Sequence, residues 1–257
     1  MDKASIGGVI LAITGIVAGL LMEGGHIGQI LQPTAAFIVI GGTLGAVLLQ
    51  FPLTTVAAAF AGMAHIFSAH HKMDHQLIGQ LVGFANKARR SGVVSLDADL
   101  KSIDDPFLRQ SLMLAVDGTE PAELRKIMHV NLDSLLDREE RLPAVFESAG
   151  GFSPTIGILG AVLGLIQVMQ HLDNIQEVGR GIAVAFVATI YGVGLANLFF
   201  LPFAGKMRIR IRDGQRRREM MLEGVIGILE GMNPRMLELK LASFADEATK
   251  EKEEKAS

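Results

Sequence analysis

The chain has 257 residues, 49% of them hydrophobic and 20% charged, and its formal net charge at pH 7 is −3. It contains no cysteine, which excludes disulfides, thiol chemistry and cysteine-ligated metals. It also lacks a phosphate-binding glycine motif and a nucleophile paired with a base, so the sequence predicts neither an enzyme nor a cofactor site.

Charged residues are strongly segregated along the chain. Four stretches contain none: residues 4–22, 24–71, 148–172 and 181–205. Each can hold about 20 apolar residues, the length of helix that crosses roughly 30 Å of hydrocarbon. We therefore predict an all-α, polytopic membrane protein with four transmembrane helices and a helical cytoplasmic domain.

The four transmembrane helices are predicted at residues 5–22, 33–51, 150–171 and 181–203. They divide the chain into transmembrane helices 1 and 2 (1–51), a cytoplasmic helical domain (52–149), transmembrane helices 3 and 4 (150–203), and a cytoplasmic extension with a charged tail (204–257). The apolar run at 53–67 is only about 15 residues long, so we expect it to lie at the interface or to pack on protein. The first helix lacks a convincing cleavage site, and we expect it to be retained.

The distribution of lysine and arginine predicts the orientation in the membrane. The connection at 23–32 has neither residue and the connection at 172–180 has only Arg180, whereas residues 52–149 carry ten and residues 204–257 carry twelve. Basic regions stay on the cytoplasmic side. Both termini are therefore predicted to be cytoplasmic.

The large loop has a helical pattern. Apolar residues recur at helical spacing from residue 77 to residue 88, and the pattern stops at Ser91 and Gly92. A second helix is predicted to begin with Pro106 in its first turn and to end at Gly118. A third helical series follows within residues 120–150, with apolar residues from Leu124 to Leu136 along one side.

Small residues recur at four-residue spacing in the spans and predict close helix packing and oligomerisation. The pairs are Gly15/Gly19, Gly41/Gly45, Gly160/Gly164 and Ala188/Gly192. Pro154 has two interpretations: a first-turn proline without backbone cost, or, with Thr155, part of the mouth of a polar path. Thr189 could bond back to its own helix, Tyr191 could fill the core, and Pro202 could mark a helix bend.

The third and fourth spans contain no Asp, Glu, Lys or Arg. An ion relay across a bilayer normally requires an ionisable side chain that faces a cavity. If these helices line such a path, the carboxylate must come from another chain.

Outside the spans, two groups of side chains could carry function. Arg89, Arg90, Asp97, Asp99, Asp104 and Asp105 form a charge cluster, for which a solvated face is the simpler interpretation. The histidines at 65, 70, 71 and 75 have only Asp74 as a nearby carboxylate, so we do not predict a metal site. The basic stretch 208–218 directly follows a span, which favours membrane lipid headgroups over nucleic acid as its partner.

The sequence resembles the MotA/PomA family of flagellar stator subunits over nearly its whole length. The motifs that carry the resemblance are "FSPTIGILGAVLGLI", "GIAVAFVATIYGVGLANLFFLPF" and "ANKARRSGVVSLDADLKSIDDPFLRQSLMLAVDG". The resemblance implies a non-enzymatic subunit of the bacterial inner membrane that forms a homo-oligomeric ring, a pentamer, around a MotB/PomB-type partner. That partner contributes one spanning helix with an essential Asp and a peptidoglycan-anchoring domain.

The resemblance also assigns roles to individual residues. Pro154 and Pro202 match two functional prolines, and Thr189 matches a threonine near the ion-binding Asp of the partner. Arg89 and Arg90 match basic residues that act on the rotor protein FliG, while Asp97 stands where the family usually has Glu. The residues that we expect along the ion path are Pro154, Thr155, Ala161, Thr189, Tyr191 and Pro202.

The choice of ion depends on Ala161, because sodium-type members resemble each other in carrying a threonine at this position. Sodium requires several oxygen ligands, whereas a proton requires only the carboxylate and a route for water. We therefore predict protons, although the wider resemblance is to the sodium-type branch. The alternative function is an ExbB/TolQ-type motor subunit that energises outer-membrane processes, but members of that group usually have three spans.

Overall fold

The structure is a computed structural model that describes residues 3–66 and 74–244. In these residues every regular element is a helix, which confirms the predicted all-α class. The elements are α1 (Lys3–Met22), η1 (Ile27–Ile30), α2 (Pro33–Ala36), η2 (Phe37–Gly41), α3 (Gly42–Gln50), α4 (Leu53–Ile66), α5 (Asp74–Ser91), η3 (Val93–Ser102), α6 (Pro106–Val116), α7 (Pro121–Gln170), α8 (Ile175–Leu195), η4 (Ala196–Phe200), α9 (Leu201–Leu229) and α10 (Pro234–Ala242). His70, His71 and the charged tail lie outside the described residues.

The chain divides by packing into two compact units. The first comprises residues 1–69 and 139–210, and the second comprises residues 70–138 and 211–257, as far as each is described. These limits differ from the predicted membrane boundaries, because packing does not report where a bilayer lies. The predicted domain limits and the orientation remain predictions.

Three helical segments are long and apolar enough to cross a membrane: Pro33–Gln50, α7, and the continuous segment Ile175–Leu229. They contain the second, third and fourth predicted spans. The first predicted span forms α1, whose apolar part, Ile6–Met22, is somewhat shorter. The short apolar run after the second span forms α4.

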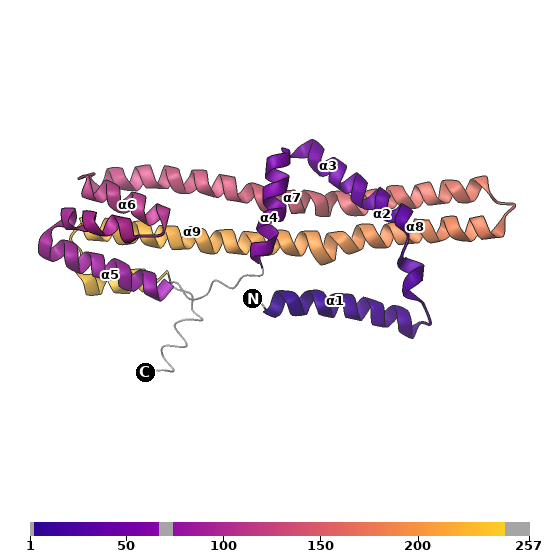
Figure 1. Ribbon diagram of the computed structural model, residues 1–257, viewed down its shortest axis with the longest axis horizontal. Helices are drawn as coiled ribbons and strands as arrows, with labels where there is room; N and C mark the ends of the chain where they lie inside the picture. The colour runs from indigo at the N-terminus through magenta and orange to yellow at the C-terminus, as the bar shows by residue number, and fades with distance from the viewer. Residues whose placement is uncertain (1–2, 67–73, 245–257) are drawn as a thin grey trace. The chain divides into compact units, whose positions relative to one another are not determined.

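In the first unit, α7 and α8 lie side by side and are joined by a short turn (Figure 1). We refer to residues 150–170 of α7 together with α8 as the hairpin. The segment α2–η2–α3 packs on the hairpin through Ala35 and Val39, which contact Val187 and Ala188. Phe146 of α7 anchors a second cluster and stacks edge-on with Phe60 and Phe203.

Pro154 lies in the interior of α7, so its interpretation as a first-turn proline is wrong. A proline inside a helix removes one backbone hydrogen bond and crowds the carbonyl four residues earlier. Such prolines are tolerated in apolar helices where neighbouring helices and hydroxyl side chains compensate. Pro202 also lies inside a continuous helical segment, two residues after the end of the π-helical turn η4.

The second unit has its own hydrophobic core, built from α5, η3, α6, α9, α10 and the first part of α7. The predicted helix ends in its loop region are confirmed. Helix α5 ends before Gly92, which has φ +79°, and α6 begins at Pro106 behind the N-cap Asp105. Gly118, with φ +84°, follows the end of α6, and both glycines adopt the left-handed conformation that side chains disfavour.

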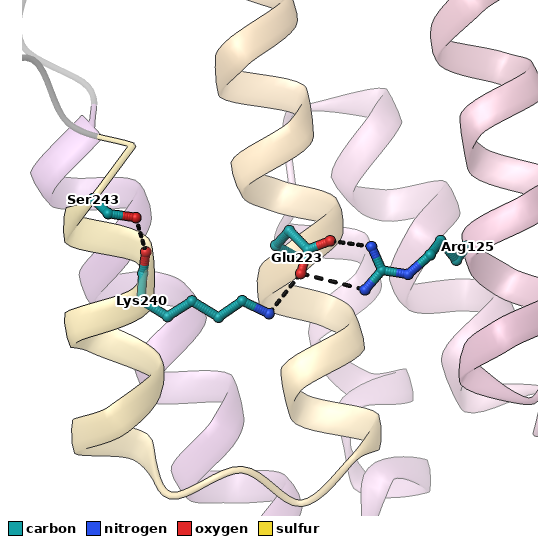
Figure 2. A network of polar contacts seen from close by, with 4 residues as sticks. All are labelled: Arg125, Glu223, Lys240 and Ser243. Carbon is teal, nitrogen blue, oxygen red and sulfur yellow. Dashed lines mark hydrogen bonds and ion pairs between the residues drawn. The ribbon is translucent and has the colours of Figure 1, made fainter.

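A partly buried ion-pair network joins three helices of the second unit (Figure 2). We name it the Glu223 clamp; its members are Arg125, Glu223 and Lys240. The Glu223 carboxylate of α9 accepts hydrogen bonds from Arg125 of α7 and, at 2.5 Å, from Lys240 of α10. Burial acts to raise the pKa of Glu223, but the two basic partners outweigh it and hold the pKa below its usual range. The clamp therefore stays charged at neutral pH and ties α10 to the long helices.

Candidate functional site

The two helices of the hairpin contact each other through backbone atoms. A Cβ on Gly157 would lie 2.9 Å from the carbonyl oxygen of Ala188, and a Cβ on Gly164 would lie 2.8 Å from that of Gly181. The predicted role of the pairs Gly160/Gly164 and Ala188/Gly192 in close helix packing is thus confirmed. Around Gly15, Gly19, Gly41 and Gly45, no described atom outside the adjoining backbone of the same helix lies within 4 Å of the Cβ position.

Each helix of the hairpin also has a face that the described chain leaves uncovered. On α7 this face carries Thr155, Ile158, Val162, Leu165 and Met169, all exposed. On α8 and η4 the exposed residues are Phe186, Ile190, Val193 and Asn197. We name these residues together the open face. It is apolar apart from Thr155 and Asn197, and no residue of it is ionisable.

Two predicted site residues, Ala161 and Thr189, lie at about the same height along the packed helices of the hairpin. Gly160 packs on Ala188, so their neighbours Ala161 and Thr189 lie at the same height. Both are half-buried. Ala161 contributes no oxygen there, and Thr189 contributes one hydroxyl.

Pro154 and Pro202 lie at different heights along the two packed helices, because Gly192, which is level with Pro154, comes ten residues before Pro202. A Cβ on Gly192 would lie 3.2 Å from the Cα of Pro154, and a Cβ on Gly150 would lie 2.7 Å from Leu201, the residue before Pro202. Pro202 is exposed and Pro154 is half-buried. The structure therefore brings the two prolines to the same end of the hairpin, where α7 and α8 are in close contact.

The hydroxyls of Thr155 and Thr189 donate to their own helix. Thr155 Oγ1 lies 2.8 Å from the carbonyl oxygen of Phe152, and Thr189 Oγ1 lies 3.2 Å from that of Ala185. A hydroxyl that donates in this way still has lone pairs for a water molecule or a cation. The local bond is thus compatible with a place on an ion path.

Tyr191 is not directed to Thr189 or to the open face. Its hydroxyl donates to the carbonyl of Ile30 at 2.5 Å and accepts from the N–H of Gln32 at 3.3 Å. These bonds fasten the chain just before α2 to the C-terminal part of α8. Tyr191 is therefore in a position to hold the second span on the hairpin.

Sequence reasoning missed two polar residues, one in the hairpin and one directly after it. Asn197 lies exposed in η4, and its amide donates to the carbonyl of Val193 at 2.9 Å. Ser153 is fully buried, and its hydroxyl donates to the carbonyl of Gly192 on the other helix at 3.0 Å. Asn197 could have been found from the sequence, because a polar residue in an apolar span is a signal by itself. Ser153 could not, because its role depends on the register of two helices.

The candidate rotor-contact residues lie together in the second unit. Arg89 and Arg90 are exposed in the last turn of α5, where the helix dipole favours positive charge. Asp97 is exposed in η3, directly after the turn at Gly92. Within the described residues, no ion pair or hydrogen bond engages these three side chains.

Two other members of the predicted charge cluster, Asp99 and Asp105, have structural partners. Asp99 pairs with Lys87 at 2.6 Å and joins η3 to α5. Asp105 caps α6 by accepting hydrogen bonds from the N–H groups of Phe107 and Leu108. The cluster therefore separates into two residues that hold the fold and four exposed charges, because Asp104 is exposed as well.

Comparisons with known proteins find relatives that match nearly the whole chain. Residues 6–92 match the motility protein A N-terminal family, and residues 99–220 match the MotA/TolQ/ExbB proton channel family. The chain is 36% identical over 245 residues to motility protein A of Bacillus subtilis, with 95% of this chain and 91% of that protein covered. It is 29% identical over 249 residues to the chemotaxis protein PomA of Vibrio alginolyticus, with 96% of each covered.

Solved structures give the same result. The chain matches the structure of C. jejuni MotAB with a TM-score of 0.90 and 31% identity, over 96% of this chain and 97% of that chain. It matches the flagellar MotAB stator complex from Bacillus subtilis with a TM-score of 0.88 and 34% identity, over 97% and 99%.

The apolar helical architecture and these matches define an ion-channel and motor component of a membrane, not an enzyme. The chain belongs to the MotA/PomA family of flagellar motor stator subunits. The proton channel family is shared with TolQ and ExbB, but the N-terminal match is specific to motility protein A. The predicted stator function is therefore confirmed over its ExbB/TolQ-type alternative.

Proposed function

We propose that this chain forms, as a homo-pentameric ring in the bacterial inner membrane, the wall of an ion path around a MotB/PomB-type partner. The observation that carries the proposal is the open face: an uncovered surface of apolar helices without one ionisable group. A chain that lacks the ion-carrying group in its spans needs a second chain that supplies a carboxylate. The partner's spanning helix is expected to occupy this face.

In this arrangement, the hydroxyls of Thr155 and Thr189 and the amide of Asn197 support a line of water along a largely apolar wall. The partner's carboxylate carries the ion past them. Ala161 at the height of Thr189 leaves few oxygens around that carboxylate, which favours protons over sodium. Both termini and the second unit lie in the cytoplasm, as the basic residues favour.

The exposed charges of Arg89, Arg90 and Asp97 contact the rotor protein FliG. Because these side chains have no partner in the described chain, they are available for an electrostatic contact. The basic stretch at 208–218 meets anionic lipid headgroups. One of its arginines, Arg208, also pairs with Glu147 at 2.7 Å.

The experiment is to express the full chain with and without a MotB/PomB-type partner in cells that lack their own stator. Swimming and ion flux are expected only with the partner, and swimming speed at fixed pH is expected to be independent of external sodium. Ala161→Thr serves as the comparison, because it adds a hydroxyl at the height of Thr189. Flux without the partner would contradict the missing-carboxylate argument, and a speed that rises with sodium and vanishes without it would contradict the proton assignment.

A further inference from the structure

Ser153 lies where α7 and α8 are closest. A Cβ on Gly192 would lie 2.6 Å from the carbonyl oxygen of Ser153 and 3.0 Å from the Cα of Gly157. The Ser153 side chain is completely buried, with 0% exposed. No side chain separates the two backbones at this height.

The hydroxyl of Ser153 makes a different bond from those of its neighbours. Thr155 and Thr189 donate to carbonyls of their own helices, which is the usual outcome for a hydroxyl inside a helix. Ser153 Oγ instead donates across to the Gly192 carbonyl, at 3.0 Å. It is therefore a hydrogen bond between helices, in a place from which water is excluded.

Both helices have irregular backbone hydrogen bonding at this height. Pro154, the next residue, has no N–H to donate to its own helix. On α8, the N–H of Ala196 is shared between the carbonyls of Gly192 and Val193, and the π-helical turn before Pro202 begins there. The Gly192 carbonyl thus receives only part of its helical hydrogen bond, and Ser153 supplies a second donor.

We propose that Ser153 is a positioning residue of the stator, whose hydroxyl fixes the spacing and register of α7 and α8 beside Pro154 and ahead of the π-helical turn that leads to Pro202. The inference rests on the proposed function, in which these helices form the wall of the ion path. With the bond in place, the two prolines move as one body when the ion passes. Without it, the irregular segments of α7 and α8 move independently and coupling to rotation weakens.

The test uses Ser153→Ala in the full chain. Since the chain has no cysteine, cysteines introduced at the exposed Ile158 and Val193 can carry spin labels specifically. The labelled chain is diluted with unlabelled chain in lipid nanodiscs, so that only distances within one chain are measured. We expect the parent to give one narrow distance peak and Ser153→Ala to give a broadened one.

The matched control is Ser111→Ala, because Ser111 is equally buried but donates to the Phe107 carbonyl of its own helix α6. It is expected to leave the distance peak and swimming unchanged, whereas Ser153→Ala, without labels, is expected to reduce swimming speed at equal membrane accumulation. A peak as narrow in Ser153→Ala as in the parent, or swimming at the parent's speed, would overturn the proposal.

If Ser153→Ala does not accumulate in the membrane, the spin-label distance is measured in Ser153→Thr instead, which retains the hydroxyl. A narrow peak at the parent's distance is then expected, and a broadened one overturns the proposal. The distance measurement needs no rotation. A parent chain that powers no swimming with any partner would therefore sink the proposed function and leave the role of Ser153 to be decided by the distances.

Discussion

At the scale of single residues, the hairpin shows how much depends on the absence of side chains. Gly157, Gly164, Gly181 and Gly192 let two helix backbones touch, which lipid alone would not drive. Not all glycines of these helices do so. Gly194, two residues after Gly192, has open space at its Cβ position.

Gly192→Ala is expected to destabilise the chain, because its Cβ would overlap the Ser153 carbonyl at 2.6 Å. Overpacking of this kind costs about 1–3 kcal/mol, which exceeds the gain of up to about 1 kcal/mol that alanine brings to a helix. Thermal unfolding of the purified chain in detergent measures the effect. Gly194→Ala is the control and should be neutral or stabilising; equal unfolding temperatures for the two variants would contradict the close packing.

Tyr191→Phe tests whether this side chain holds the second span. The variant leaves the Ile30 carbonyl and the Gln32 N–H without their hydrogen-bond partner, at a cost of about 1 kcal/mol. We expect faster proteolysis of the connection at residues 23–32 and a lower unfolding temperature. A change in ion dependence with no change in proteolysis would instead assign the hydroxyl to the ion path.

At the scale of elements, the sequence predicts helix ends that are set by local residues such as glycine and proline. The ends of α5 and α6 could be predicted, because Gly92 and Gly118 permit a left-handed turn and Pro106 suits a first helical turn. The interior position of Pro154 could not, because tolerance of a helical proline depends on neighbouring helices. For the same reason, the sequence did not distinguish the small-residue pairs that make contact from those that do not.

We expect the attachment of α10 to depend on the Glu223 clamp. Glu223→Gln removes the charge that holds Arg125 and Lys240, while the carboxylate is only 18% exposed and its partners are 41% and 35% exposed. Because the partners are partly solvated, we expect a loss of about 1 kcal/mol. Hydrogen exchange in α10 should become faster. Glu123→Gln, which affects an exposed pair with Lys126, is the control and should change nothing.

The pH dependence of this effect follows from the lowered pKa of Glu223. A carboxylate with a lower pKa in the folded state stabilises at every pH above its unfolded value of about 4.3. That stability is lost as the pH falls through the folded value. The difference between parent and Glu223→Gln should therefore be constant near neutral pH and vanish in acid; a difference that changes between pH values near neutrality would contradict it.

At the scale of the whole molecule, charged residues are unevenly distributed along the chain. The first unit has no Asp, Glu, Lys or Arg between Gly181 and Gly205, whereas the second unit exposes Arg89, Arg90 and Asp97. The charge cluster was visible in the sequence, but the sequence could not separate Asp99 and Asp105, which hold the fold, from the exposed members. That separation required the ion pair with Lys87 and the cap of α6.

Reversal of both exposed arginines, Arg89→Glu with Arg90→Glu, is expected to impair rotation while the chain still accumulates in the membrane. Exposed ion pairs are individually worth about 0–1 kcal/mol and are screened by salt, so either single reversal should have a smaller effect. Rotation of tethered cells measures it, and charge changes on the rotor should restore part of the loss. Full torque from the double variant would show that these arginines only face solvent.

The bonds of Tyr191 have a spectroscopic consequence. The chain contains one tyrosine and no tryptophan, so the ultraviolet fluorescence of the purified chain arises almost entirely from the phenol that holds the segment before α2. The intensity of its emission and its quenching by added solutes therefore report on a single contact, that of Tyr191 with Ile30 and Gln32. The unmodified protein thus carries a built-in optical probe for the attachment of its second span to its fourth.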